Sequence, residues 1–175
     1  GALASITNTG TLLDVSAVAN ADGNSATANA YITVAIFQSA SATGAGYATA
    51  SFANGDGGVV SITADALANG IVNEAYASAT IHDGILQVAS AGTGNALAYA
   101  TNAGTLTIAA NASANGVTAA FANAEIKSGI VQNAVADGYA TAELVNSGTL
   151  NITADANANA ASGAATAMSP SASAT

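Results

Sequence analysis

The sequence predicts an all-β fold built from repeats, and three observations support this prediction. Similar phrases recur about every 45 residues, which is typical of an array that stacks one structural unit. Along each phrase, apolar and polar residues alternate strictly, which is the pattern of a half-buried strand. Asn-Gly and Asp-Gly pairs separate the phrases, as turns do. Alanine favours helices, but the period of two indicates strands throughout.

The main repeat consists of a glycine, a branched apolar pair and then alanine at every second position. It occurs at 58–66, 104–112 and 148–156, with a degenerate copy from Gly10 that carries one extra residue. Alignment of the copies gives one core position in each. We expect these residues to lie above one another and to anchor the core: Leu13, Val60, Leu106 and Leu150.

A second phrase, containing Gln38, Gln87 and Gln132, lies between the main copies. We therefore predict a β-solenoid of ~22-residue coils in ~45-residue double repeats, with each unit forming two strands. The expected breaks are Asn69-Gly70, Asp83-Gly84, Asn115-Gly116, Asp137-Gly138 and the turn at 146–148.

An antiparallel β-sandwich or meander is the alternative architecture, because Asn-Gly and Asp-Gly pairs are also strong hairpin signals. The solenoid is favoured, since only stacked coils require matching between units residue by residue. Stacking would align two outward ladders of amides and carboxylates. Their members are Asp22, Asn69, Asn115 and Asn159 in one ladder, and Asp65, Asn111 and Asp155 in the other.

The sequence divides into a single repetitive β domain over 1–160 and a tail over 161–175. The tail loses the branched residues and contains the only proline, Pro170. We expect the tail to be flexible or to join a neighbouring subunit.

Composition excludes several classes of partner. Ten acidic residues stand against Lys127 alone, giving a net charge of −9, so nucleic acid is not expected to bind. The same balance disfavours anionic membrane surfaces, and no apolar run is long enough to insert into a membrane. Cysteine is absent, which excludes thiol chemistry. We expect a secreted or cell-surface protein; if it is secreted, its signal peptide has already been removed, because the sequence starts without a charged n-region and an apolar h-region.

The segments 102–108 (Asn-Ala-Gly-Thr-Leu-Thr-Ile) and 146–152 (Asn-Ser-Gly-Thr-Leu-Asn-Ile) carry a family resemblance, and 8–12 is a shorter match. They resemble the Asn-x-Gly-x-Leu-x-Ile coils of bacterial autotransporter and filamentous-haemagglutinin passenger domains. This resemblance implies a secreted, surface-attached β-helix that acts in adhesion or biofilm structure.

No residue set predicts catalysis or cofactor binding, and the chain is not expected to be an enzyme. The only histidine, His82, is expected to face outward from a strand, where no cleft would hold a substrate. Calcium is the one metal considered, with Asp22 and Asp56 in the best loop candidates. Turns favour Asp for conformational reasons as well, so these loops are also explained without a metal.

Four tyrosines are the candidate subunit contacts. Tyr47, Tyr76 and Tyr139 each start the sequence Tyr-Ala-Thr/Ser-Ala, and Tyr99 starts a partial copy of it. All four are expected to face outward. Outward tyrosines on a surface of small residues are typical of interfaces.

The predicted function is structural: an extracellular, self-assembling subunit of a filament, matrix fibre or surface coat whose partner is the chain itself. The alternative is a monomeric adhesin-type passenger domain that binds a glycan or host surface. Ice binding is disfavoured because the threonine rows are interrupted. A polysaccharide lyase is disfavoured because the chain has no arginine and one lysine.

Overall fold

The computed structural model describes residues 1–169, which form twelve β-strands and no helix. Each circuit of the chain uses three strands. The first coil contains β1 (Ala2–Asn8), β2 (Leu13–Gly23) and β3 (Ala26–Ala42), and the second contains β4 (Ala48–Asn54), β5 (Val59–Gly70) and β6 (Glu74–Ala91). The third contains β7 (Ala96–Asn102), β8 (Thr105–Gly116) and β9 (Ala119–Ala136), and the fourth contains β10 (Ala140–Asn146), β11 (Thr149–Ala160) and β12 (Ala164–Met168).

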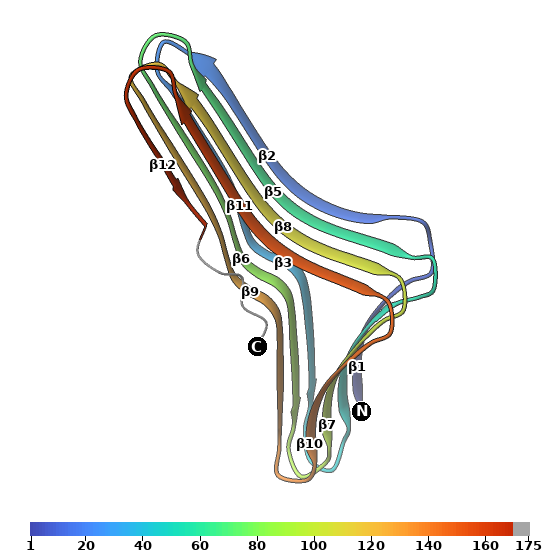
Figure 1. Cartoon of the computed structure of the whole chain (residues 1–175). Coiled ribbons are helices and arrows are strands. Elements are labelled where there is room, and N and C mark those ends of the chain that lie inside the picture. The colour runs from blue at the N-terminus through green and yellow to red at the C-terminus, as the bar shows by residue number, and fades with distance from the viewer. Residues whose placement is uncertain (170–175) are drawn as a thin grey trace.

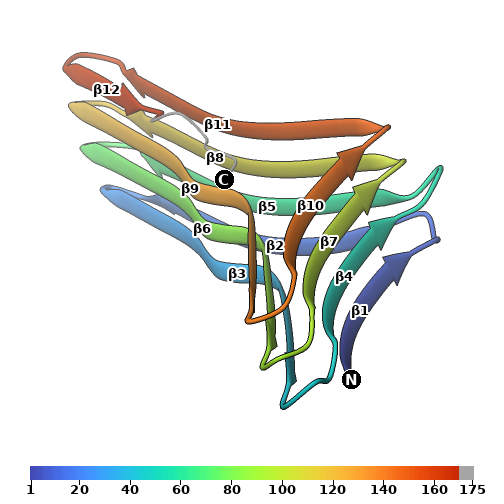
Figure 2. The ribbon, with the colours of Figure 1, turned by 90° about the horizontal axis from the view of Figure 1, so that it is seen from below.

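Equivalent strands of successive coils pair in parallel and build three sheets of four strands. Sheet A has the order β1-β4-β7-β10, sheet B the order β11-β8-β5-β2, and sheet C the order β12-β9-β6-β3. Figure 2 shows the four coils stacked along one axis. The all-β prediction and the solenoid arrangement are confirmed, and the antiparallel sandwich or meander is wrong because every pairing within 1–169 is parallel.

The predicted coil length of ~22 residues is wrong, because one coil takes the whole repeat of about 45. Side chains hydrogen-bonded between successive coils are 46, 48 and 44 positions apart. The two related halves of each repeat therefore do not stack on one another. The leucine half lies in sheet B and the glutamine half lies in the second part of sheet C.

The cross-section of a coil is three-armed rather than round, as Figure 1 shows in a view down the stack. Sheet B packs against sheet C along one arm, and the second part of sheet C packs against sheet A along another. Two hydrophobic clusters fill these arms. The cluster between sheets C and A contains alanine alone, so the two backbones approach closely there. The larger cluster adds isoleucine, leucine, valine and Phe52.

The predicted core positions form one continuous row, with Leu13 paired to Val60, Val60 to Leu106, and Leu106 to Leu150. Val60 and Leu106 are fully buried, whereas Leu13 and Leu150, in the first and last coils, are partly buried. This confirms the register, including the extra residue in the first copy.

The Asp83-Gly84 pair is not a turn, contrary to the prediction, because it lies inside β6. A Cβ on Gly84 would lie 2.5 Å from the Gly129 carbonyl oxygen and 2.8 Å from Ile108 Cδ1. On Gly129, the equivalent residue one coil later, a Cβ would lie 2.7 Å from Ile152 Cδ1. Glycine is therefore present because sheets B and C meet closely at the centre of the coil.

The tail predicted over 161–175 begins inside the solenoid. Its residues 164–168 form β12, which pairs with residues 119–123 of β9. The part of the tail at 170–175 lies outside the described residues.

Candidate assembly and binding surfaces

A row of four inward-facing asparagines lines the corner where sheet A turns into sheet B. Asn8 Nδ2 donates to Asn54 Oδ1 at 2.9 Å, Asn54 Nδ2 to Asn102 Oδ1 at 2.7 Å, and Asn102 Nδ2 to Asn146 Oδ1 at 2.7 Å. Each of these three amides also donates to a backbone carbonyl at the start of sheet B in the next coil: Val59, Thr105 and Thr149. The row therefore joins successive coils and fastens sheet A to sheet B.

A second inward row consists of Gln38, Gln87 and Gln132, on sheet C. Gln87 Nε2 donates to Gln38 Oε1 and Gln132 Nε2 donates to Gln87 Oε1, both at 2.9 Å. The same nitrogens donate to backbone carbonyls of sheet A, those of Ala50 and Tyr99 in the case of Gln87. This row runs in the opposite direction to the asparagine row, because its amides donate toward the N-terminal coil.

These inward amide rows were not predicted as buried ladders from the sequence. Gln38, Gln87 and Gln132 were recognised as repeated residues, and Asn102 and Asn146 only as motif positions. The signal that would have found them is parity, since each amide occupies the position at which the alternation places an apolar side chain. No buried side-chain nitrogen or oxygen in 1–169 lacks a hydrogen bond.

The outward faces carry the two ladders that were predicted. Asn69 Nδ2 donates to Asp22 Oδ1 at 2.7 Å and Asn115 Nδ2 to Asn69 Oδ1 at 3.0 Å. In the other ladder, Asn111 Nδ2 donates to Asp65 Oδ1 at 2.7 Å. A shallow groove of about 530 Å³ follows this second ladder across coils two to four, beside Leu67, Ser113 and Asn157.

Carboxylates are kept apart along the stack. In the strand pairings of 1–169, no Asp or Glu is paired with another Asp or Glu. Their partners are instead amides, hydroxyls or apolar side chains, as for Asp65 between Val18 and Asn111. Stacked residues lie about 4.8 Å apart, so two carboxylates in neighbouring positions of a row would repel one another. The observed pairing avoids this repulsion.

The two calcium candidates lie at opposite ends of sheet B. Asp22 is near the end of β2 and accepts the hydrogen bond from Asn69. Asp56 lies in the loop between β4 and β5, next to Gly57, whose φ is +71°. Asp56 lines a cavity of about 260 Å³ whose other lining residues include Gly58, Gly104, Thr105 and Thr149. No group of three His, Cys, Asp or Glu side chains comes together anywhere in the described residues.

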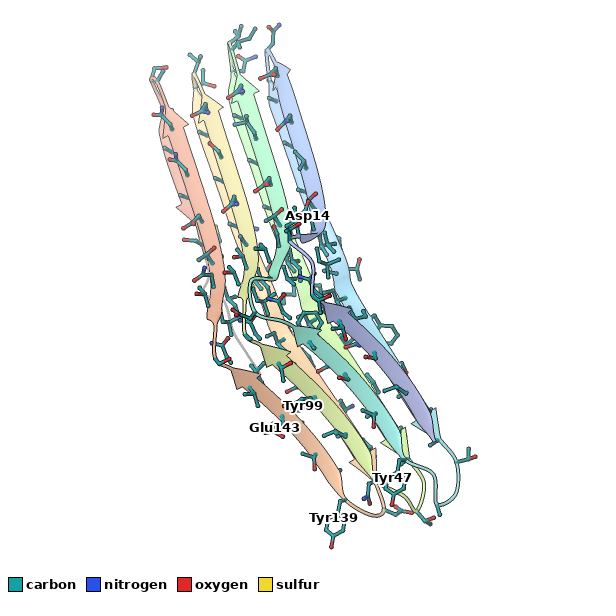
Figure 3. All side chains as sticks on the ribbon, turned by 90° about the vertical axis from the view of Figure 1, so that its right-hand side faces the viewer. Asp14, Tyr47, Tyr99, Tyr139 and Glu143 are labelled. Atoms are coloured by element: carbon teal, nitrogen blue, oxygen red, sulfur yellow. The ribbon has the colours of Figure 1, made fainter. Side chains whose placement is uncertain are left out.

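The four tyrosines lie on the outer surface but do not form one row. Tyr76 pairs with Thr27 and Phe121 on sheet C, and Tyr99 pairs with Ser51 and Glu143 on sheet A. Figure 3 shows Tyr99 and Glu143 on neighbouring strands, away from Tyr47 and Tyr139. The four similar phrases therefore do not all occupy equivalent positions in the coil, since Tyr76 lies on sheet C and Tyr99 lies within a strand of sheet A.

Tyr47 and Tyr139 do occupy equivalent positions, at the turn that precedes sheet A, with Asn95 between them in the third coil. They are 64% and 80% exposed. Together with Thr49, Leu97 and Thr141 they line a cavity of about 260 Å³. Asn95 Oδ1 accepts a hydrogen bond from the Tyr139 backbone N–H at 3.1 Å, which joins this side chain to the backbone of the next coil.

His82 faces outward from β6, and its Nδ1 lies 3.0 Å from Asp83 Oδ2. Asp83 pairs with Ser128 of β9, and among the described residues His82 and Asp83 belong to no group of three His, Cys, Asp or Glu side chains.

A scan against protein-family models found no match, and searches of curated proteins and of solved structures found no significant match either. Residues 1–169 contain no helix that is long and apolar enough to cross a membrane.

Proposed function

We propose that the chain is a structural subunit that assembles with copies of itself into an extracellular filament, matrix fibre or surface coat. Its function is mechanical. The stack of parallel hydrogen bonds runs along one axis in all three sheets, and two buried amide rows reinforce it. Such a rod resists stretching along its axis because every coil is bonded to the next.

The observation that carries this proposal is the incomplete burial of apolar side chains and the unpaired strand edges in the first and fourth coils. In the interior, Val60, Ile62, Leu106 and Ile108 are at most 1% exposed. Their equivalents Leu13, Val15, Leu150 and Ile152 are only partly buried. Outer strands β2 and β11 also carry one unpaired backbone edge each among the described residues. A further coil on either end would bury these side chains and pair these edges.

The outer surface supports a structural role over catalysis. It carries many small polar side chains together with exposed apolar ones such as Leu3, Val18 and Phe37, and acidic groups are distributed singly along the stack. An extracellular location is supported by the composition, because a single lysine and no arginine leave trypsin-like proteases one cleavage site.

Electron microscopy and sedimentation velocity of the purified protein at neutral pH, without and with calcium, test the proposal. We expect unbranched filaments whose axial repeat is a multiple of about 4.8 Å. Monodisperse single-chain particles under both conditions would refute self-assembly. Filaments that appear only with calcium would add Asp22 and Asp56 as the first residues to replace.

Glycan binding as a monomer is the second candidate, and the cavity between Tyr47, Asn95 and Tyr139 favours it. Two exposed aromatic rings beside a side-chain amide can contact the apolar face and the hydroxyl groups of a sugar. In a glycan screen, Tyr139→Ala should then lose binding, whereas Tyr31→Ala, on the outer face of sheet C, should retain it. Equal binding by both variants would remove this cavity from consideration.

A further inference from the structure

We propose that copies of the chain associate head to tail in one register, with β1 of one copy paired in parallel to β10 of its neighbour and β2 paired to β11. This proposal rests on the proposed function, since it specifies how the self-assembling subunits meet. The first coil of one copy would then stack on the fourth coil of its neighbour, as if it were that neighbour's fifth coil. Three independent properties of the two ends favour this arrangement.

The first property is the direction of the inner asparagine row. Its amides all donate toward the C-terminal coil, so the row ends in Asn146, whose Nδ2 donates only to the Gly148 carbonyl within the described residues, at 3.2 Å. At the other end, Asn8 Oδ1 accepts only from the Gly10 backbone N–H there, also at 3.2 Å. A free donor position thus faces one end and a free acceptor position faces the other. A head-to-head contact would instead place two acceptors together.

The second property is the match of apolar rows. In the proposed register Leu150 meets Leu13 of the neighbouring copy, and Ile152 meets Val15, continuing rows already observed in sheet B. In sheet A, Leu144 meets Ile6 of the neighbour, which extends the row that contains Phe52. A slip by one residue would place inward apolar side chains against outward polar ones.

The third property is the charge pattern on the outer face. The register places Asn151 opposite the neighbour's Asp14 and Asn159 opposite its Asp22, so amides meet carboxylates. Asn69 already donates to Asp22 at 2.7 Å from the other side, which shows the geometry such a contact takes. Asp155 would meet Val18, and Glu143 would meet Ser5. Two chains of net charge −9 can therefore associate without any carboxylate facing another in these rows.

The contact is complete over sheets A and B. In sheet C the contact would be partial. The last strand there, β12, is short and pairs with only residues 119–123 of β9, so β12 alone would meet β3 of the neighbour. Cross-linking is accordingly best placed in sheet A, where both end strands span the full sheet.

Engineered disulfides test the register directly, since the chain contains no cysteine. The outward row Leu3, Thr49, Leu97 and Thr141 continues to Leu3 of the neighbour, whose Cα would lie about 4.8 Å from that of Thr141. This separation lies within the range that a disulfide spans. Oxidation of the double variant Leu3→Cys/Thr141→Cys should give a ladder of covalent multimers on a non-reducing gel.

Leu3→Cys/Val145→Cys is the matched control, because Val145 lies on the same strand, exposed, but four residues away. It should remain uncross-linked. Multimers from this control, or covalent dimers from Leu3→Cys alone, would overturn the proposed register. Sedimentation of the unmodified protein separates the two proposals. A monomer refutes self-assembly and the register together, whereas an assembly that lacks the 3–141 cross-link refutes the register alone.

Asn146→Asp provides an independent measurement. The carboxylate keeps the acceptor that Asn102 Nδ2 uses but loses the donor that faces the neighbour. We expect association at least about tenfold weaker, with only a small loss in the thermal stability of the single chain from the exposed hydrogen bond to the Gly148 carbonyl. Unchanged association would contradict the proposed role of the asparagine row.

Discussion

Asn54 and Asn111 occupy the two faces of the same solenoid and use the same amide group differently. Inside, Asn54 is 1% exposed and donates to Gly58 O, Thr105 O and Asn102 Oδ1. Outside, Asn111 is half-buried and donates to Asp65 alone. The inner amide satisfies backbone carbonyls that water does not reach, whereas the outer amide separates two carboxylates. On the inner face, hydrogen bonds between side-chain amides and backbone carbonyls fix how successive coils align. On the outer face, repulsion between carboxylates limits which side chains can lie above one another.

The largest expected difference between the faces concerns a buried charge. Ala110 is fully buried in the row that contains Ala64 and Ala154. Ala110→Asp should abolish folding, because a buried, unpaired carboxylate costs several kcal/mol. Ser113→Asp is the control on the outer face of β8, between Leu67 and Asn157, and it should fold. Far-UV circular dichroism distinguishes the two outcomes, and a folded Ala110→Asp protein would contradict the packing described for this row.

Loss of an inner amide should have the next largest effect. Gln87→Met preserves volume but removes the donors to Gln38, Ala50 and Tyr99 and the acceptor for Gln132. We expect a loss of about 3 kcal/mol in the free energy of unfolding, since buried groups are left without partners. Urea denaturation measures this change.

The control for Gln87→Met is Asn69→Ala, which removes an amide from the outer face of the same coil. Asn69 contacts Asp22 and Asn115 where water can replace it. A loss below about 1 kcal/mol is expected. Equal losses in the two variants would show that burial does not distinguish the two kinds of row.

Sequence alternation was sufficient to predict strands, parity and the residues that stack. Leu13, Val60, Leu106 and Leu150 share a row, and so do the members of both outer ladders. These features are local or repeat at one period, so they can be read without knowing the path of the chain.

The coil length could not be predicted in the same way. The leucine and glutamine halves resemble one another because both are long strands with alternating alanine, and this pattern does not say which sheet a strand joins. The turn predicted at Asp83-Gly84 was wrong for a related reason. Beside Asp83, Gly84 resembles a turn residue, but it is required by the side chain of Ile108, which comes from another sheet and from the next coil. Contacts of this kind depend on the cross-section of the coil.

The smallest expected effect tests whether charge limits the outer rows. Asn111→Asp would place a carboxylate between Asp65 and Asp155, whereas Asn115→Asp would place one between Asn69 and Asn159. Both changes add one negative charge to the same face of β8 and both remove one donated hydrogen bond. At low salt, Asn111→Asp should therefore be the less stable variant by about 1 kcal/mol, from repulsion at about 4.8 Å on either side. The difference should shrink in 1 M salt, where the screening length is about 3 Å. Urea denaturation at both salt concentrations measures it. A difference that persists unchanged in high salt would mean that the geometry of the amide, rather than its neutrality, selects asparagine between the two carboxylates.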